Sequence, residues 1–499
     1  MENRLYYREL KCYPNADESL LREIGKKDYI DLTLLPGKKM KEEFRAYILY
    51  RGTVVSLSTI QAEKTFYKQI CMAISQSRHP PDSFLDWDME KWTRLIEEWM
   101  LQNNIPVFYH KKSVYGTTNR VEAGLIRYLK SFLRFSQPED TRPEQEKDKW
   151  DLDKLGIKIK ENPIYKTQTI SFTGIFQKGI REEVKKAIYH HLKYEKIATV
   201  KRELTSLRQF SKFLKERQLA IQSCSEIDRK LLEEYLTYKA TNGSSGRSNS
   251  DDIIKLRSVI ETVGCIYKYE KLEKLFINTD IPPEVQPEFR SYTDQELKRL
   301  NAHITKLDEQ ITRCLVIHQM LGTRISDTLT LRRDCLYEMD GMDMITIHQV
   351  KSRTFEKPIS AELTTLIKKA ISYSKEYYGE AVYIFVDEKD ISRPLQYTTI
   401  KHKVLTMIQK EDLRDDEGNL FKFSSHMFRH FYGVKLTELH LDDWTIAKLL
   451  GHKRISSVKY YRKMSNRLLA DESRRAREKQ TKILLENLKG WEDEYEQIR

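Results

Sequence analysis

The amino-acid sequence predicts a protein that is mainly α-helical and carries a small antiparallel sheet. Apolar residues recur at intervals of three and four through most of the chain, which is the spacing of amphipathic helices. Residues 344–350 instead alternate and are rich in β-branched side chains, as a strand is. Two proline-rich polar segments, residues 136–150 and 281–288, interrupt these patterns. A chain of 499 residues is long enough for about three domains.

Composition narrows the class of protein. The chain carries 87 lysines and arginines against 74 aspartates and glutamates, a formal net charge of +13. This excess favours a polyanionic partner, although many basic proteins have none. The six cysteines form no Cys-x-x-Cys pair, which argues against structural zinc and favours a reduced, cytoplasmic setting. No apolar run is long enough to cross a membrane, so we expect no membrane partner.

Helical patterns begin in the N-terminal part of the chain. One helix is expected from Ser58, a second after Asp88, and a third from Leu125 to Leu133. The order resembles that of residues 198–263, 140 positions later. Either a duplicated helical unit or the general likeness of amphipathic helices accounts for it. Residues 136–150 then indicate a linker or exposed loop.

A second helical region follows, in residues 184–280. Its expected helices span residues 200–214, begin after Asp228, and run from Asp251 to Val263. The Gly-Ser run at residues 242–250 indicates a flexible loop inside this domain.

A domain boundary is expected near residue 288. Three prolines precede it within residues 281–288 and cannot continue a helix. Thr293 and Glu296 have the spacing of a capping box, which predicts a new helix there.

Arg324 lies in Leu321-Gly-Thr-Arg-Ile-Ser-Asp327, at a predicted break between two helices. Gly322 permits the backbone to approach a ligand closely. Asp327 lies three residues after the arginine, where a helix would return it to the guanidinium. An isolated Gly-x-Arg is more often a solvated surface residue, so this motif gains weight only from those that follow.

Lys351 occupies the expected turn of a hairpin. The strand at residues 344–350 leads into it, and a returning strand is expected at residues 355–360. A lysine at a hairpin tip is usually just solvated, and Arg353 and Lys357 are nearby alternatives for any functional cation.

His426 and Arg429 are three residues apart on a predicted helix, so both face the same way. Ser424 or Ser425 can cap this helix, whose first turn offers backbone N–H groups to a phosphate. The neighbouring His430 is expected to be structural.

His452 follows a glycine that can end a helix, in Leu450-Gly-His. A short helix is expected over residues 455–461 and contains Tyr460 and Tyr461. Side chains of consecutive helical residues point about 100° apart, so only one tyrosine can face the arginines.

Basic groups and a tyrosine, without an acidic metal-ligand cluster, are what metal-free attack on a phosphodiester requires. Arginines bind the non-bridging oxygens in pairs of hydrogen bonds. The tyrosine attacks phosphorus, and another group protonates the departing oxygen. Clustered cations also favour the phenolate, because the pKa of a free phenol is about 10.

The order of these motifs resembles the catalytic domain of the tyrosine recombinases, the phage integrase family. The resemblance is specific over residues 290–465 and loose over residues 184–280. It implies that Lys351 donates a proton to the leaving 5′ oxygen, and the spacing from the histidine selects Tyr461 as nucleophile. Gly433 departs from the alanine that is more usual there. The implied catalytic set is Arg324, Lys351, His426, Arg429, His452 and Tyr461, with Asp327 in support.

The resemblance also implies an order of domains. A helical core-binding (SAM-like) domain precedes a mixed α/β catalytic domain, and the N-terminal extension is expected to be a helical DNA-binding or oligomerisation domain. The expected segments are an extension at 1–150, a core-binding domain at 184–280, a catalytic domain at 288–465 and a helical tail at 466–499.

The implied function is site-specific DNA recombination by a mobile-element integrase or transposase, through a 3′-phosphotyrosyl intermediate without metal, cofactor or ATP. One alternative is a type IB topoisomerase-like relaxing enzyme, whose Ser-Lys-x-x-Tyr box is absent. Another is a catalytically silent DNA-binding accessory protein.

The expected partners are double-stranded DNA, further protomers in a tetramer on DNA, and possibly a second recombinase. The free protein is expected to be monomeric, cytoplasmic and bound to the bacterial nucleoid when on DNA. An apolar patch at residues 483–491 is expected to pack on a neighbouring protomer, the alternative being its own domain.

Overall fold

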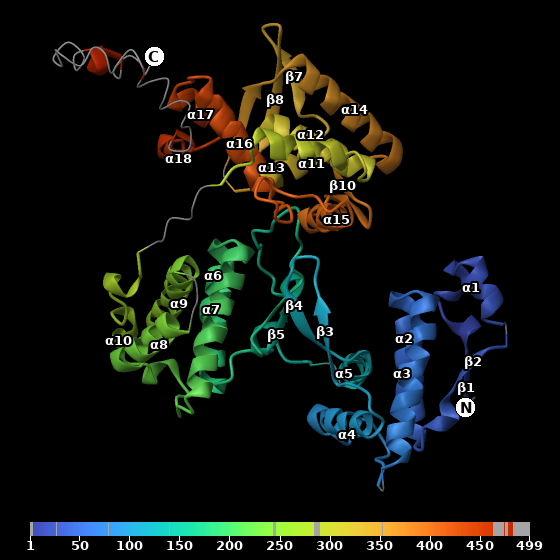
Figure 1. The fold of residues 1–499 in the computed structure, drawn as a ribbon. Helices are drawn as coiled ribbons and strands as arrows, with labels where there is room; N and C mark the ends of the chain where they lie inside the picture. Colours follow the sequence, from blue (N-terminus) through green and yellow to red (C-terminus); the bar gives the residue numbers. More distant parts are fainter. Residues whose placement is uncertain are drawn as a thin grey trace, which may run out of the picture. The chain divides into compact units, whose positions relative to one another are not determined.

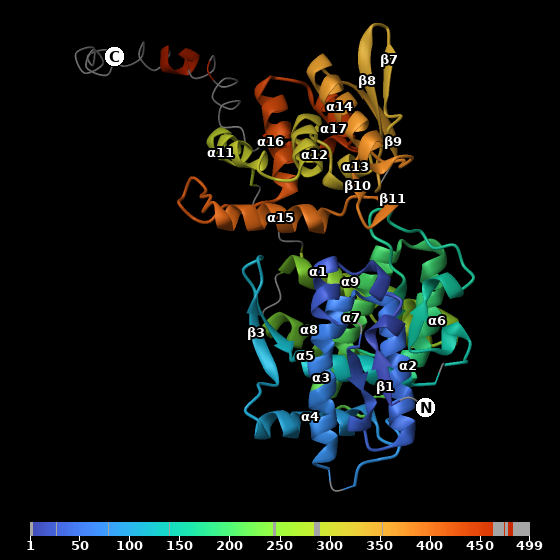
Figure 2. The same cartoon turned by 90° about the vertical axis from the view of Figure 1, so that its right-hand side faces the viewer.

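The computed structural model forms two compact units, residues 1–141 and 142–499 (Figures 1 and 2). Helices dominate the described elements and the strands form short antiparallel ladders, as the sequence predicts. None of the helices described is long and apolar enough to cross a membrane. The predicted tail lies outside the described residues, apart from positions 474 and 478–482. The structure describes residues 3–25, 27–77, 79–138, 140–242, 246–283, 290–351, 353–462, 474 and 478–482.

The N-terminal unit is built on four long helices around an aromatic core that includes Phe44, Trp92 and Phe132. The three helices expected from the sequence are present, and the Asp88 side chain accepts a hydrogen bond from Lys91 N at the start of one of them. The helices are α1 (Glu18–Glu23), α2 (Lys38–Val54), α3 (Leu57–Ser75), α4 (Met89–Gln102) and α5 (Gly124–Ser136). Two antiparallel ladders, which the sequence did not predict, pair β1 (Arg4–Tyr6) with β2 (Tyr29–Asp31) and β3 (Phe108–Lys112) with β4 (Thr118–Glu122).

The helical part of the second unit starts earlier than predicted. Trp150 lies at the end of the expected linker, yet it is fully buried in a core that continues to Phe276. The prediction of a loop at residues 242–250 is wrong from Gly246 onwards, where a helix has already begun; the buried Ser250 donates to Pro282 O at 2.6 Å. The elements are β5 (Lys149–Asp151), β6 (Thr169–Ser171), α6 (Lys178–Tyr194), α7 (Ile197–Glu216), α8 (Arg229–Thr241), α9 (Gly246–Tyr267) and α10 (Glu270–Glu273).

The last part holds a three-stranded antiparallel sheet, β7-β8-β9, whose β8 and β9 are the predicted hairpin. The capping box of Thr293 and Glu296 is present. The strands are β7 (Leu336–Met339), β8 (Met342–His348), β9 (Thr354–Pro358), β10 (Val386–Asp387) and β11 (Asp390–Pro394). The helices are α11 (Asp294–Ile304), α12 (Glu309–Leu321), α13 (Ile325–Leu329), α14 (Ala361–Tyr378), α15 (Tyr397–Lys410), α16 (Ser425–Glu438), α17 (Asp443–Leu450) and α18 (Lys459–Arg462).

Candidate active site

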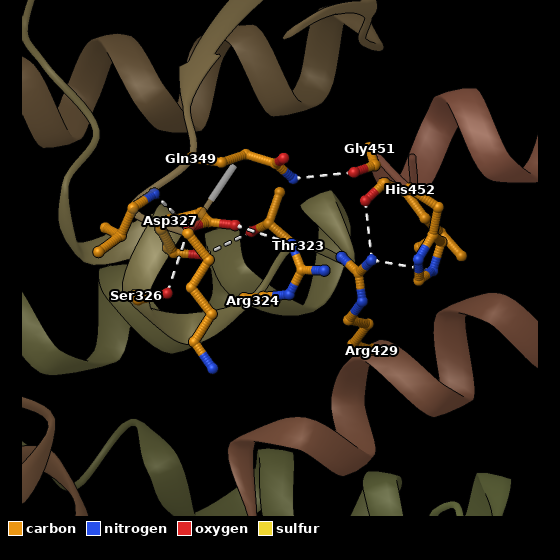
Figure 3. Close-up of polar contacts among 12 residues, drawn as sticks. Thr323, Arg324, Ser326, Asp327, Gln349, Arg429, Gly451 and His452 are labelled. Carbon is orange, nitrogen blue, oxygen red and sulfur yellow. Dashed lines mark hydrogen bonds and ion pairs between the residues drawn. The ribbon is translucent and has the colours of Figure 1, made fainter. Parts of the chain in front are cut away.

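Arg324 is positioned by a sharp reversal between α12 and α13. Gly322 ends α12 in the left-handed region, with φ of +62°. A Cβ at this position would lie 2.3 Å from the Tyr432 ring, so only glycine fits. Arg324 then becomes the N-cap residue of α13, and its guanidinium turns toward that of Arg429 (Figure 3).

Asp327 lies one turn into α13 and is 1% exposed. Its Oδ1 accepts a hydrogen bond from Val350 N at 3.1 Å, and its Oδ2 lies 3.7 Å from Arg324 Nη1. Burial is the largest influence on this carboxyl and raises its pKa. At 3.7 Å the two groups attract without sharing a hydrogen bond, and Arg324 Nη1 is buried without an acceptor. The site therefore holds a guanidinium with donor capacity to spare.

Arg429 comes from α16 and is 2% exposed. Its Nη1 donates to Gly322 O at 3.0 Å, and its Nη2 donates to Leu450 O at 2.8 Å. The same Nη2 lies 3.1 Å from His452 Nε2. Arg429 thus holds two segments in place relative to each other: the chain reversal before Arg324 and the end of α17 (Figure 3).

His452 follows the predicted glycine cap. Gly451 has φ of +64°, and a Cβ there would lie 2.6 Å from Gln349 Nε2. Because the arginine can only donate, His452 Nε2 is an acceptor and the proton of the neutral ring lies on Nδ1. The Tyr461 hydroxyl is 3.4 Å from the same Nε2. Desolvation, followed by the charges of Arg429 and Arg324, lowers the pKa of His452 to about 3.

His426 occupies the first turn of α16. Its ring packs edge to face on His430, with centroids 4.4 Å apart. Desolvation, then His430 and Arg429, lowers its pKa to about 4, although its side chain still reaches the surface. Both site histidines are therefore neutral at neutral pH, because desolvation and then the nearby cations disfavour a further positive charge. A bound anion would relieve that repulsion.

Tyr461 is 4% exposed and its hydroxyl points into this cluster. Its ring lies against Gly433, where a Cβ would be 2.8 Å from Tyr461 Cδ1. The glycine that departs from the usual alanine therefore makes room for the tyrosine. Tyr460 shares helix α18, but its side chain is outside the described part of the structure.

Lys351 lies in the turn between β8 and β9, as predicted, and the structure does not bring it into the cluster. Its side chain is exposed and has no hydrogen bond or ion pair in the part of the chain that the structure describes. Arg353 is exposed in the same turn.

Lys357 lies behind the site instead. It is 3% exposed, and its Nζ donates to Leu321 O at 2.6 Å. The ammonium also lies 5.2 Å from the centroid of the Tyr432 ring. Burial, then the charge of Arg429, lowers its pKa to about 7. Lys357 and Arg429 therefore bind consecutive carbonyls, those of Leu321 and Gly322, and hold the reversal from behind.

His318 is a further residue of the site that sequence reasoning missed. It is fully buried in α12, with Nδ1 2.8 Å from Thr328 Oγ1 and Nε2 3.0 Å from Ser425 O. It therefore ties the helices that carry Arg324 and Arg429. Desolvation lowers its pKa to about 4. Its position on an apolar helix face gave no signal beyond that of an ordinary core residue.

The expected cap of α16 is wrong in detail. Ser424 occupies the N-cap position, but its side chain makes no capping hydrogen bond. Its backbone N–H instead donates to Tyr292 Oη at 2.8 Å. His430 Nδ1 hydrogen-bonds with Arg290 O at 2.7 Å, a contact of the structural kind that we expected.

The chain is similar to known proteins over parts of its length. The model of the phage integrase family matches residues 290–467. Transposase B from transposon Tn554 of Staphylococcus aureus is 26% identical over 359 residues, 71% of this chain and 57% of the transposase. Tyrosine recombinase XerA of Pyrococcus furiosus is 27% identical over 49% of this chain and 80% of its own length. A crystal structure of XerH site-specific recombinase bound to difH substrate aligns at a TM-score of 0.42 and 17% identity, over 58% of this chain and 83% of that one.

The alignment with the transposase covers most of this chain. It covers little more than half of the transposase, so this chain spans only part of that relative's length. The family match covers the segment that brings Arg324, Arg429, His452 and Tyr461 together. Residues 290–467 thus match the phage integrase family, and the chain is similar over this segment to tyrosine recombinases.

Proposed function

We propose that the protein is a site-specific DNA recombinase of a mobile element, which cuts and rejoins DNA through a 3′-phosphotyrosyl intermediate. The observation that carries this proposal is the meeting of two guanidinium groups, two neutral imidazoles and one phenol in a single site. A phosphodiester is the anion that fits it, because guanidinium groups match its non-bridging oxygens and the phenol supplies a nucleophile. The relatives named as a transposase and a tyrosine recombinase support the same reaction.

In the first step, Arg324 and Arg429 bind the scissile phosphate. The Tyr461 oxygen attacks phosphorus while its proton passes to His452 Nε2, the acceptor 3.4 Å away. A P–O bond to tyrosine forms and the bond to the 5′ oxygen breaks. Lys351 gives that oxygen a proton, so the products are a 3′-phosphotyrosine and a free 5′ hydroxyl.

The second step reverses the first on a partner strand. An incoming 5′ hydroxyl attacks the phosphotyrosine and gives its proton to Lys351. The Tyr461 oxygen departs and takes back the proton held by His452. Asp327 keeps Arg324 in place throughout. The bond energy of the phosphodiester is conserved in the protein–DNA link, so the cycle needs no nucleotide hydrolysis.

The other expectations remain parts of this proposal. The segments at 184–280 and 288–465 act as core-binding and catalytic domains, and the extension at 1–150 adds DNA contacts or protomer contacts. Four protomers exchange the strands of two duplexes, while the protein free of DNA is a monomer. Mass measurement with and without a recombination site tests the change in assembly.

The proposed reaction is tested by trapping on a nicked suicide substrate in EDTA. We expect a covalent adduct that resists denaturation, is lost in Tyr461→Phe and is retained in Tyr460→Phe. Formation of the adduct only when a divalent metal is added would overturn the mechanism. Relaxation of supercoiled DNA without sequence preference, and without strand exchange, would favour the topoisomerase alternative.

A further inference from the structure

The N-terminal unit carries a hairpin that the proposed reaction does not use. β3 and β4 join α4 to α5 and pair in register from Phe108 opposite Glu122 to Lys112 opposite Thr118 (Figure 1). The turn closes tightly, with Ser113 N donating to Thr117 O at 2.8 Å. The hairpin is therefore an ordered ribbon.

Neither face of β3 is covered within the described structure, and β4 is exposed as far as Arg120. Side chains on one face and those on the other are alike exposed along β3, including Phe108 at 38% and Tyr109 at 49%. Tyr115 at the tip is also 49% exposed. Two-stranded ribbons are marginal in water and normally bury one face. Aromatic side chains on an uncovered ribbon indicate a surface that a partner covers.

The charge of the ribbon identifies the kind of partner. Lys111, Lys112 and Arg120 project from its two strands. The Arg120 guanidinium stacks on the Phe108 ring at 3.7 Å, which limits its motion while leaving its edge toward solvent. The carboxylate of the ribbon, Glu122, is neutralised by Lys130 at 2.6 Å. The uncovered surface is thus cationic and aromatic.

We propose that residues 108–122 form a DNA-binding ribbon, which adds phosphate contacts to the duplex that the catalytic domain cleaves. This inference rests on the proposed function. A two-stranded ribbon fits the width of the major groove. Three cations without a compensating carboxylate suit a regular array of phosphates better than the mixed surface of a protein partner.

The test compares K111A/K112A/R120A with a matched control, K27A/K38A/K39A, which removes three exposed lysines from the same unit. Affinity of the full-length protein for a duplex carrying its site is measured across salt concentrations. Each lost phosphate contact lowers the slope of log K against log salt by about 0.9, so we expect a drop of roughly 2 to 3 in the ribbon variant and none in the control. K111A/K112A, which keeps the Arg120–Phe108 stack, should lose about 2.

Footprinting should show a shorter protected region for the ribbon variants. An unchanged slope and footprint would overturn the inference. A changed oligomeric state of the free protein with unchanged salt dependence would overturn it too, because the ribbon would then bind protein. Adduct formation by the unmodified chain is measured alongside, so that failure of the ribbon and failure of the proposed recombinase activity are told apart.

Discussion

Arg429 and Lys351 differ in whether the folded protein already holds their side chains in place. Arg429 is buried and bonded to two carbonyls and an imidazole, from segments more than a hundred residues apart in sequence. Lys351 lies on an exposed turn, and its side chain has no partner among the described residues. Under the proposed mechanism, the phosphate-binding half of the site is thus preorganised before DNA arrives, whereas DNA binding would have to place the proton donor.

This difference has a physical basis. Donors fixed in advance stabilise charge in the transition state without reorganising. If Lys351 is the proton donor that we propose, its place on an exposed turn would keep the enzyme from cutting until the substrate is bound. The comparison therefore predicts that the two halves respond differently to substitution.

The largest effect is expected for Arg429→Ala. Cleavage should fall by roughly 10³- to 10⁵-fold, as for arginines that stabilise phosphoryl transfer. Stability should also fall by about 2–5 kcal/mol, because the carbonyls of Gly322 and Leu450 lose their donor. Single-turnover cleavage and denaturant unfolding measure the two losses. Arg429→Lys should remain poorly active, since one ammonium cannot bridge three groups; full activity in that variant would refute a shaped clamp.

Lys351→Ala should lower the rate of cleavage by roughly 10²- to 10⁴-fold without changing stability. A substrate with sulfur in place of the leaving 5′ oxygen should restore the rate, because a thiolate departs without a proton. Lys357→Met is the control: it should lower stability and gain nothing from the sulfur substrate. Rescue of Lys357→Met rather than Lys351→Ala would assign the proton donor to the buried lysine.

Gly433→Ala should lower cleavage by about tenfold to a hundredfold. The new methyl group would lie 2.8 Å from the Tyr461 ring and must displace it, and a displacement of about 1 Å can cost that much. DNA affinity should stay unchanged, which gel-shift titration checks. Gly25→Ala, where a Cβ would meet no atom within 4 Å and the backbone is not left-handed, controls for loss of a glycine. Equal activity of both variants would show that the tyrosine needs no such fit.

A separate effect, on stability and not on cleavage, is a dependence on pH. Burial lowers the pKa of His318 to about 4, while the unfolded residue has a pKa of about 6.5. The unfolded state therefore takes up a proton first, so stability is full above pH 6.5 and declines toward pH 4, by roughly 3 kcal/mol for this residue. His318→Gln should reduce the decline and Lys351→Ala should leave it unchanged. Unfolding curves from pH 4 to 7 decide between these outcomes.

Much of the local structure could be predicted from the sequence. Helices such as α7 and α12 follow from apolar spacing, and the β8–β9 hairpin follows from alternation and a polar turn, because both signals are local. The prediction of a loop at residues 242–250 is wrong from Gly246 onwards because it rests on composition alone. Ser250 is buried and hydrogen-bonded to Pro282 O, which favours a helix there.

The candidate site could be predicted only in part. The motifs named residues of the right chemistry, and the structure brings Arg324, Arg429, His452 and Tyr461 together. His318 hydrogen-bonds with Ser425 O, and Lys357 donates to Leu321 O. Both carbonyls are distant in sequence from the side chains that they bind. No local pattern contains such information.

The proposed mechanism is tested most directly by identifying the amino acid that becomes linked to DNA. The adduct from a suicide substrate is digested with protease and nuclease, and the modified peptide is sequenced by mass spectrometry. We expect a nucleotide on Tyr461, attached through its 3′ phosphate. A nucleotide on Tyr460, or a linkage through a 5′ phosphate, would contradict it.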